Sequence, residues 1–132
     1  MKISILLPLK ENFSPSYAGA VSLFINDTLR SSKFRKNITV FGHTNYKKKF
    51  RQKYSNIDVK KNFFSSQNKE YVKKFIEIEK INKSQIIELH NRPIYLRYLV
   101  NDLNKRDYIL YFHNDPLTMS GSKSIKERSF LL

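Results

Sequence analysis

The chain contains no cysteine, and this absence excludes several kinds of chemistry. Without thiols there is no disulfide framework, no thiolate metal site and no cysteine nucleophile. Such a composition fits a reducing compartment. The chain also lacks any apolar stretch near the ~20 residues that a membrane-spanning helix needs, so we expect no such helix.

Acidic residues are scarce, with 11 Asp and Glu against 25 Lys and Arg, which gives a net charge of +14. This excess attracts polyanions such as nucleic acid, nucleotide phosphates and anionic lipid headgroups. The densest basic cluster, between Lys47 and Arg51, is interleaved with Tyr46, Phe50 and Tyr54, a pattern also found in nucleic-acid-binding surfaces. Because the lysines are scattered along the whole chain, we favour a solvated basic surface and do not expect nucleic acid as the partner.

The first twenty residues partly imitate a secretory signal, with an apolar run at Ile3–Leu9 followed by the small residues Ala18–Ala20. The run is short, however, contains Pro8, and is interrupted at once by Lys10 and Glu11. We therefore predict that this segment is the first core strand of the mature domain and is not a cleaved signal.

Hydrophobic patterns predict alternating strands and helices in a single domain spanning residues 1–132. Short apolar runs indicate strands, the last of them buried, and apolar residues at helical spacing indicate helices. An alternating order predicts a parallel sheet with right-handed crossovers, hence an α/β, Rossmann-like three-layer domain. The final helix stops on the apolar stretch SFLL, which we interpret as a domain incomplete at its C-terminus. The predicted strands are 3–9, 37–42, 57–64, 84–89 and 108–112, and the predicted helices are 19–32, 67–82, 93–104 and 122–132.

Polar residues follow three of the predicted strands. The loop after the first strand ends at Gly19-Ala20, which opens a helix; His90-Asn91-Arg92 follows the fourth strand, and His113-Asn114-Asp115 follows the fifth. Ligands of open α/β sheets bind outside the carboxyl ends of the strands. If the fourth strand lies beside the first, all three clusters converge on one rim.

Each of these residues has a functional and a structural interpretation. Gly19 suits an anion seat at a helix start, or it merely breaks the loop, and the full Gly-x-Gly-x-x-Gly fingerprint is absent. His113, and less readily His90, suits a hydrogen-bonding or proton-carrying role, or it caps a strand end. Arg92 suits forked binding of phosphate or carboxylate. Asp115 pairs with His113, binds a sugar hydroxyl or forms a turn; a lone His-x-Asp is a poor metal signature, so we predict no metal site.

Several stretches resemble one family. The segments KISILLPLKENFSPSYAGAVSLFINDTLR, NITVFG, IIELHNRP and ILYFHNDPLTMSGSKSIKER are similar to the N-terminal half of family 4 retaining glycosyltransferases of the GT-B class. The last segment is the most specific, and together the resemblance covers essentially the whole chain. The resemblance implies the acceptor-side domain of an enzyme that transfers a sugar from a nucleotide-sugar co-substrate to a glycan or lipid-linked acceptor, with no cofactor.

The resemblance also implies roles for individual residues. Gly19 and Ala20 match the loop near the donor phosphate and the acceptor, and His113 matches the histidine that faces the transferred sugar. The remaining matched residues, implied to bind substrate, are His90, Asn91, Arg92, Asn114 and Asp115. The family's C-terminal donor domain, with its paired-glutamate motif, is absent here, so we expect turnover to require a partner domain. The expected location is the cytoplasm, with peripheral contact to the inner face of the membrane. Two other hypotheses stay open: a non-catalytic basic α/β module for nucleic acid or anionic membrane, and an inactive remnant.

Overall fold

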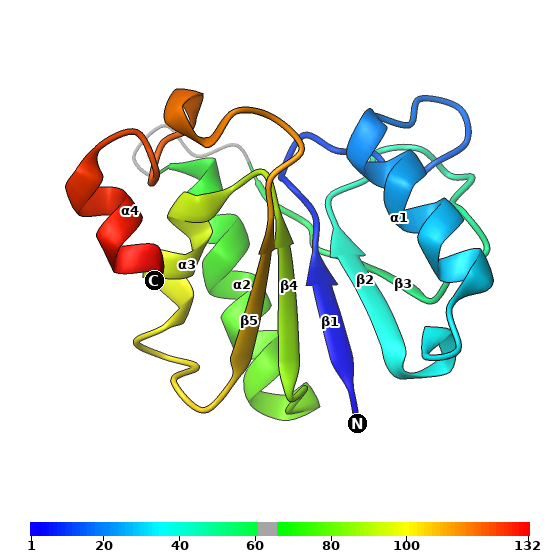
Figure 1. Cartoon of the computed structure of the whole chain (residues 1–132). Helices are drawn as coiled ribbons and strands as arrows, with labels where there is room; N and C mark the ends of the chain where they lie inside the picture. Colours follow the sequence, from blue (N-terminus) through cyan, green and yellow to red (C-terminus); the bar gives the residue numbers. More distant parts are fainter. Residues whose placement is uncertain (61–65) are drawn as a thin grey trace.

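The computed structural model describes residues 1–60 and 66–132. Five parallel strands form one sheet in the order β3-β2-β1-β4-β5, with helices on both faces (Figure 1). The predicted α/β, Rossmann-like class and the predicted order of elements are confirmed. The elements are β1 (Ile3–Leu6), α1 (Ala20–Ser31), a 3-10 turn η1 (Arg35–Asn37), β2 (Ile38–Gly42), β3 (Tyr54–Asn56), α2 (Gln67–Asn82), β4 (Ile86–His90), α3 (Pro93–Leu99), β5 (Asp107–Tyr111), a 3-10 turn η2 (Pro116–Thr118) and α4 (Ile125–Leu131).

Strand β1 occupies the centre of the sheet, and its side chains divide the core into two halves. Ile5 and Leu7 belong to the apolar cluster that includes Val21 and Ile25 of α1. Leu6 belongs to the larger cluster beneath α2 and α3. The continuous apolar run at the start of the chain is therefore explained by burial on both faces, as parallel sheets require.

Three strand predictions need correction. The first strand ends at Leu6 rather than at residue 9. The third strand is Tyr54–Asn56 rather than 57–64, and residues 61–64 of that prediction lie outside the described part. Its three residues are held by pairing with β2, where Val40 opposes Tyr54, and its apolar pattern is too short to detect. The fifth strand lies at the edge of the sheet and is not buried as predicted. Helix α1 packs near β1 and β2, so Ile109 and Tyr111 of β5 stay exposed.

The helix predictions fare better. Helix α2 has the predicted bounds, whereas α3 begins at Pro93 as predicted but ends at Leu99, five residues early. Residues 100–104, predicted to be the last turn of this helix, form non-helical turns and bends. In the two described stretches, no helix combines the length and the apolar character needed to cross a bilayer.

A buried carboxylate fastens the C-terminal end of α2 to the sheet. Glu79 has no exposed surface. Its Oε1 accepts hydrogen bonds from Ser4 Oγ at 2.5 Å and from Asn82 Nδ2 at 2.9 Å. Its Oε2 accepts from Ser84 Oγ at 2.5 Å and from Ser84 N at 3.2 Å. One side chain thus links the start of β1, the end of α2 and the turn before β4.

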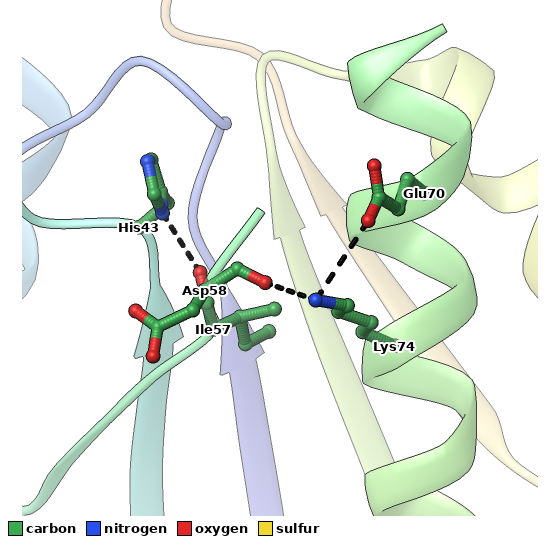
Figure 2. Close-up of polar contacts among 5 residues, drawn as sticks. All are labelled: His43, Ile57, Asp58, Glu70 and Lys74. Carbon is green, nitrogen blue, oxygen red and sulfur yellow. Dashed lines mark hydrogen bonds and ion pairs between the residues drawn. The ribbon is translucent and has the colours of Figure 1, made fainter. Parts of the chain in front are cut away.

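A second polar cluster holds the loop after β3 against the middle of the domain (Figure 2). His43 Nδ1 lies 2.8 Å from the carbonyl oxygen of Ile57, and Lys74 Nζ donates to the carbonyl oxygen of Asp58. Figure 2 shows the Asp58 carboxylate pointing away from Lys74, which instead lies 3.7 Å from Glu70 on the same helix. Since a carbonyl only accepts, His43 carries a proton on Nδ1.

Candidate functional site

The carboxyl ends of β1, β4 and β5 meet at one edge of the sheet, at the top of Figure 1. Strand β1 pairs with both β2 and β4, so the order of strands switches direction there. The first and fourth strands are therefore neighbours, which is the condition for the polar clusters to share one rim. A cavity of about 430 Å³ lies at this switch point, where open α/β sheets bind ligands. Its lining residues are Pro8, Lys10, Glu11, Val21, Asn91, Arg92, Asn114, Thr118, Met119 and Ser120.

Three of the predicted site residues, Asn91, Arg92 and Asn114, line this cavity. An adjacent cavity of about 350 Å³ shares Asn91, Arg92 and three other lining residues with it and extends toward Asn68 at the start of α2 and Tyr98 near the end of α3. The two cavities adjoin each other through these shared residues at the carboxyl edge of the sheet. Gly19, Ala20, His90, His113 and Asp115 do not line either cavity.

Asn91 organises the loop that carries His113. Its backbone adopts the left-handed region, with φ of 52°, which Asn tolerates better than most residues. Its Oδ1 accepts hydrogen bonds from the backbone N–H of His113 at 2.7 Å and of Asn114 at 3.3 Å. Its own N–H donates to the carbonyl of Tyr111 at 2.9 Å. One buried asparagine therefore joins the ends of β4 and β5.

Replacing Asn91 with alanine is expected to lower the free energy of unfolding by about 2–3 kcal/mol, because it removes two hydrogen bonds and strains a left-handed backbone. Asn91→Gly removes the same hydrogen bonds without the strain, so its loss should be smaller by about 1 kcal/mol. Urea unfolding of both variants measures the difference. Equal losses would show that the backbone of residue 91 contributes no strain.

The N-terminus of α1 already holds a carboxylate of the chain. Glu11 Oε2 accepts hydrogen bonds from Ser22 Oγ at 2.8 Å and from Ser22 N at 3.3 Å. A Cβ on Gly19 would lie 2.4 Å from Glu11 Oε1, so glycine is what admits this close approach. The positive end of a helix favours an anion, and Glu11 supplies one. An external phosphate at Gly19 and Ala20 would have to displace it.

His90 and His113 form a hydrogen-bonded pair that ends on a carboxylate. Glu88 Oε1 lies 2.6 Å from His90 Nε2, and His90 Nδ1 lies 2.8 Å from His113 Nε2. The His90 ring is fully buried and stacks on Tyr111, with ring centroids 5.0 Å apart. The exposed His113 ring meets Phe24 of α1 edge-on at 4.9 Å. The pair therefore lies between α1 and the ends of β4 and β5, beside the cavity.

Partial desolvation of its exposed ring lowers the pKa of His113 below its ordinary value of 6.5, and the neighbouring His90 lowers it further. Glu11 and Glu88 oppose this shift without reversing it. His113 is consequently neutral at pH 7 and has one ring nitrogen that accepts hydrogen bonds. Among the residues that the structure describes, no group of three or more His, Cys, Asp or Glu side chains has the arrangement of a metal site.

The structure gives Asp115 a turn role, because its Oδ1 accepts from the Leu117 N–H at 2.9 Å and caps the short turn η2. Sequence reasoning missed Lys10, Glu11 and Glu88. The first two directly follow the predicted strand 3–9, so the rule that singled out His113 would also have found them. The signal for Glu88 was an acidic residue inside an otherwise apolar strand.

The aromatic rings of the basic cluster pack on other rings of the chain. Tyr54 stacks on Phe13 with centroids 5.4 Å apart, and Phe50 meets Phe13 edge-on at 5.0 Å. Tyr46 stacks on Tyr17 at 5.2 Å. Burial raises the pKa of Tyr54 to about 12. These contacts give the rings a packing role within the domain, which agrees with the interpretation of this segment as an ordinary basic surface.

Comparisons with protein-family models, curated proteins and solved structures gave no match to this chain. The fold class is therefore established by the sheet topology alone. The resemblance to family 4 glycosyltransferases depends on the sequence segments quoted above.

Proposed function

We propose that this chain is the acceptor-side domain of a retaining glycosyltransferase that uses a nucleotide sugar and acts on a glycan or lipid-linked acceptor. One observation carries the proposal. Segments that are far apart in the sequence and individually resemble the family supply the walls of a single polar cavity at the switch point of the sheet. Envelope polysaccharide or lipopolysaccharide synthesis is the process in which we place it.

The cavity offers groups suited to sugars and phosphates. The side-chain amides of Asn91 and Asn114 suit sugar hydroxyls, whereas Lys10 and Arg92 suit phosphate oxygens. Lys10 and Arg92 would stabilise the negative charge that develops on the departing phosphate. The start of α1 is not given this role, because Glu11 already lies there. His113 would hold a hydroxyl of the donor sugar by a hydrogen bond and would not act as a general base.

Transfer would require a second, donor-binding domain, either in a longer chain or from a partner. The paired-glutamate motif of such domains does not occur in these 132 residues. The scattered lysines would favour contact with anionic headgroups on the cytoplasmic face of the membrane. The domain alone should therefore bind ligands without turning them over.

Arg92→Gln is expected to weaken ligand binding about tenfold, since one charge-assisted hydrogen bond contributes about 1.5 kcal/mol. Backbone amide shifts of the labelled chain would be followed by NMR during titration with UDP-glucose, UDP-N-acetylglucosamine, GDP-mannose and short-chain prenyl diphosphate sugars. Saturable shifts should concentrate at Asn91, Arg92 and Asn114.

Arg35→Gln is the matched control, because it removes the same charge from an exposed residue that precedes β2, at the opposite edge of the sheet. It should bind as the unmodified chain does. Equal weakening by both substitutions, or shifts spread over surface lysines and lost at moderate salt, would favour the basic-module hypothesis instead.

A further inference from the structure

Three side chains form a continuous hydrogen-bonded row from the sheet to the exposed ring of His113. Glu88 contacts His90 at 2.6 Å, and His90 contacts His113 at 2.8 Å. Both nitrogens of the fully buried His90 ring are therefore occupied. His113 is exposed, and its backbone N–H is bonded to Asn91, a residue of the cavity wall. His113 is thus the end of the row that a ligand can reach.

The positions of the hydrogens follow from the end of the row at Glu88. An ionised carboxylate only accepts, so His90 Nε2 carries a proton. In a neutral ring His90 Nδ1 is then a bare acceptor, and His113 Nε2 must carry the proton between the two rings. In a neutral His113 this leaves Nδ1 bare. Glu88 thereby decides, through His90, which nitrogen of His113 is free to accept.

We propose that Glu88 and His90 are positioning residues that make His113 a proton-dependent switch between hydrogen-bond acceptor and donor beside the cavity. In the neutral state, Nδ1 of His113 accepts a hydrogen bond. When a proton from solvent binds Nδ1, the proton on Nε2 of His113 moves to Nδ1 of His90. His90 becomes an imidazolium next to the Glu88 carboxylate, and Nδ1–H of His113 becomes a donor. One proton enters, one proton shifts, and no bond between heavy atoms changes.

The charged groups around the pair determine how readily it takes up this proton. Glu88 from β4 and Glu11 from the loop after β1 favour the added charge. His90 opposes protonation of His113, and the hydrogen bond between the two rings couples the proton positions on them. The other groups that face the pair or the adjacent cavity are the uncharged rings of Tyr111 on β5 and Phe24 on α1, and the cations Lys10 and Arg92.

The switch selects between classes of ligand. A sugar hydroxyl both donates and accepts, so it can pair with His113 in either state. A phosphate or carboxylate oxygen only accepts, so it can pair with Nδ1 only after the pair has gained its proton. At neutral pH the arrangement therefore favours a hydroxyl at His113 over an anionic oxygen. The proton arrangement itself rests on the contacts within the chain and is independent of the proposed function.

The direct test is to measure the nitrogen-15 shifts of the imidazole rings across pH on the unmodified, ligand-free chain. With three histidines, the spectrum contains three rings, and His43 is an internal control because its Nδ1 is bonded to the Ile57 carbonyl. At neutral pH we expect the Nε2–H tautomer for His90 and His113 and the Nδ1–H tautomer for His43. On acidification, the first proton that the His90–His113 pair takes up should change the signals of both rings together, in one coupled step.

Glu88→Gln tests the origin of the arrangement, since a glutamine amide can either donate or accept. We expect mixed tautomers at both His90 and His113, and a fall of about one pH unit in the pH at which the pair takes up its first proton. The His43 tautomer should not change. A predominant Nδ1–H tautomer of His113 in the unmodified chain overturns the proposal without any variant. Unchanged His113 signals in a folded Glu88→Gln chain overturn the role of Glu88. Because no ligand is used, either result is separate from the fate of the proposed glycosyltransferase function.

Discussion

Replacing Glu79 with alanine is expected to lower the free energy of unfolding by about 3 kcal/mol, the largest loss of stability that we predict for a single polar side chain. The carboxylate accepts hydrogen bonds from Ser4, Asn82 and Ser84, two of which are fully or almost fully buried serines. Alanine would leave the buried hydroxyls of Ser4 and Ser84 without this acceptor, whereas Asn82 Nδ2 would keep its hydrogen bond to Ser4 Oγ at 3.2 Å. The helix itself would not suffer, because alanine is the best helix former.

Chemical denaturation of Glu79→Ala and Glu77→Ala distinguishes this network from a general effect of charge. Glu77 lies on the same helix and is exposed, so its replacement should change stability by less than about 0.5 kcal/mol. Glu79→Gln retains one acceptor oxygen and should fall between the two. If Glu79→Ala were no less stable than Glu77→Ala, the link between α2 and the two strands would contribute nothing to folding.

The second large effect is expected from Gly121→Ala, which should destabilise the segment that forms one wall of the cavity. Gly121 has φ of 96°, a conformation that residues with a Cβ rarely adopt. An added Cβ would lie 2.6 Å from the backbone nitrogen of Ile94 and 2.8 Å from its Cα, at the rigid start of α3. We expect the free energy of unfolding to fall by about 2–4 kcal/mol. The clash should be relieved largely by displacement of the neighbouring lining residues Met119 and Ser120.

Amide exchange and backbone shifts over residues 113–124 would measure this displacement, together with ligand affinity. Gly42→Ala is the matched control, because its added Cβ would meet the end of the flexible Leu7 side chain at 2.9 Å and not a backbone atom. It should leave the segment unchanged. Native-like spectra and unaltered ligand binding in Gly121→Ala would show that the wall does not depend on this close approach.

Sequence patterns were sufficient where one local signal dominated. The helix at 67–82 has apolar residues at helical spacing from Tyr71 to Ile81, and its observed bounds are those predicted. Pro93 correctly marked the start of α3, since proline suits the first turn of a helix. The length of α3 and the position of β3 were not predictable, because a helix end and a three-residue strand depend on neighbours that are distant in the sequence.

The candidate site also contains residues that the sequence predicted and contacts that only the structure revealed. The rule that ligands bind beyond the carboxyl ends of parallel strands led from the sequence alone to Asn91, Arg92 and Asn114, all of which line the cavity. It could not show that Glu11 caps the helix opening at Gly19, nor that Glu88 reaches His113 through His90. Local periodicity determined the class of fold and the edge of the sheet where a ligand would bind. Only the tertiary structure decided which charged groups and protons meet there. These contacts join side chains from separate strands and loops, and the spacing of those residues along the chain does not predict them.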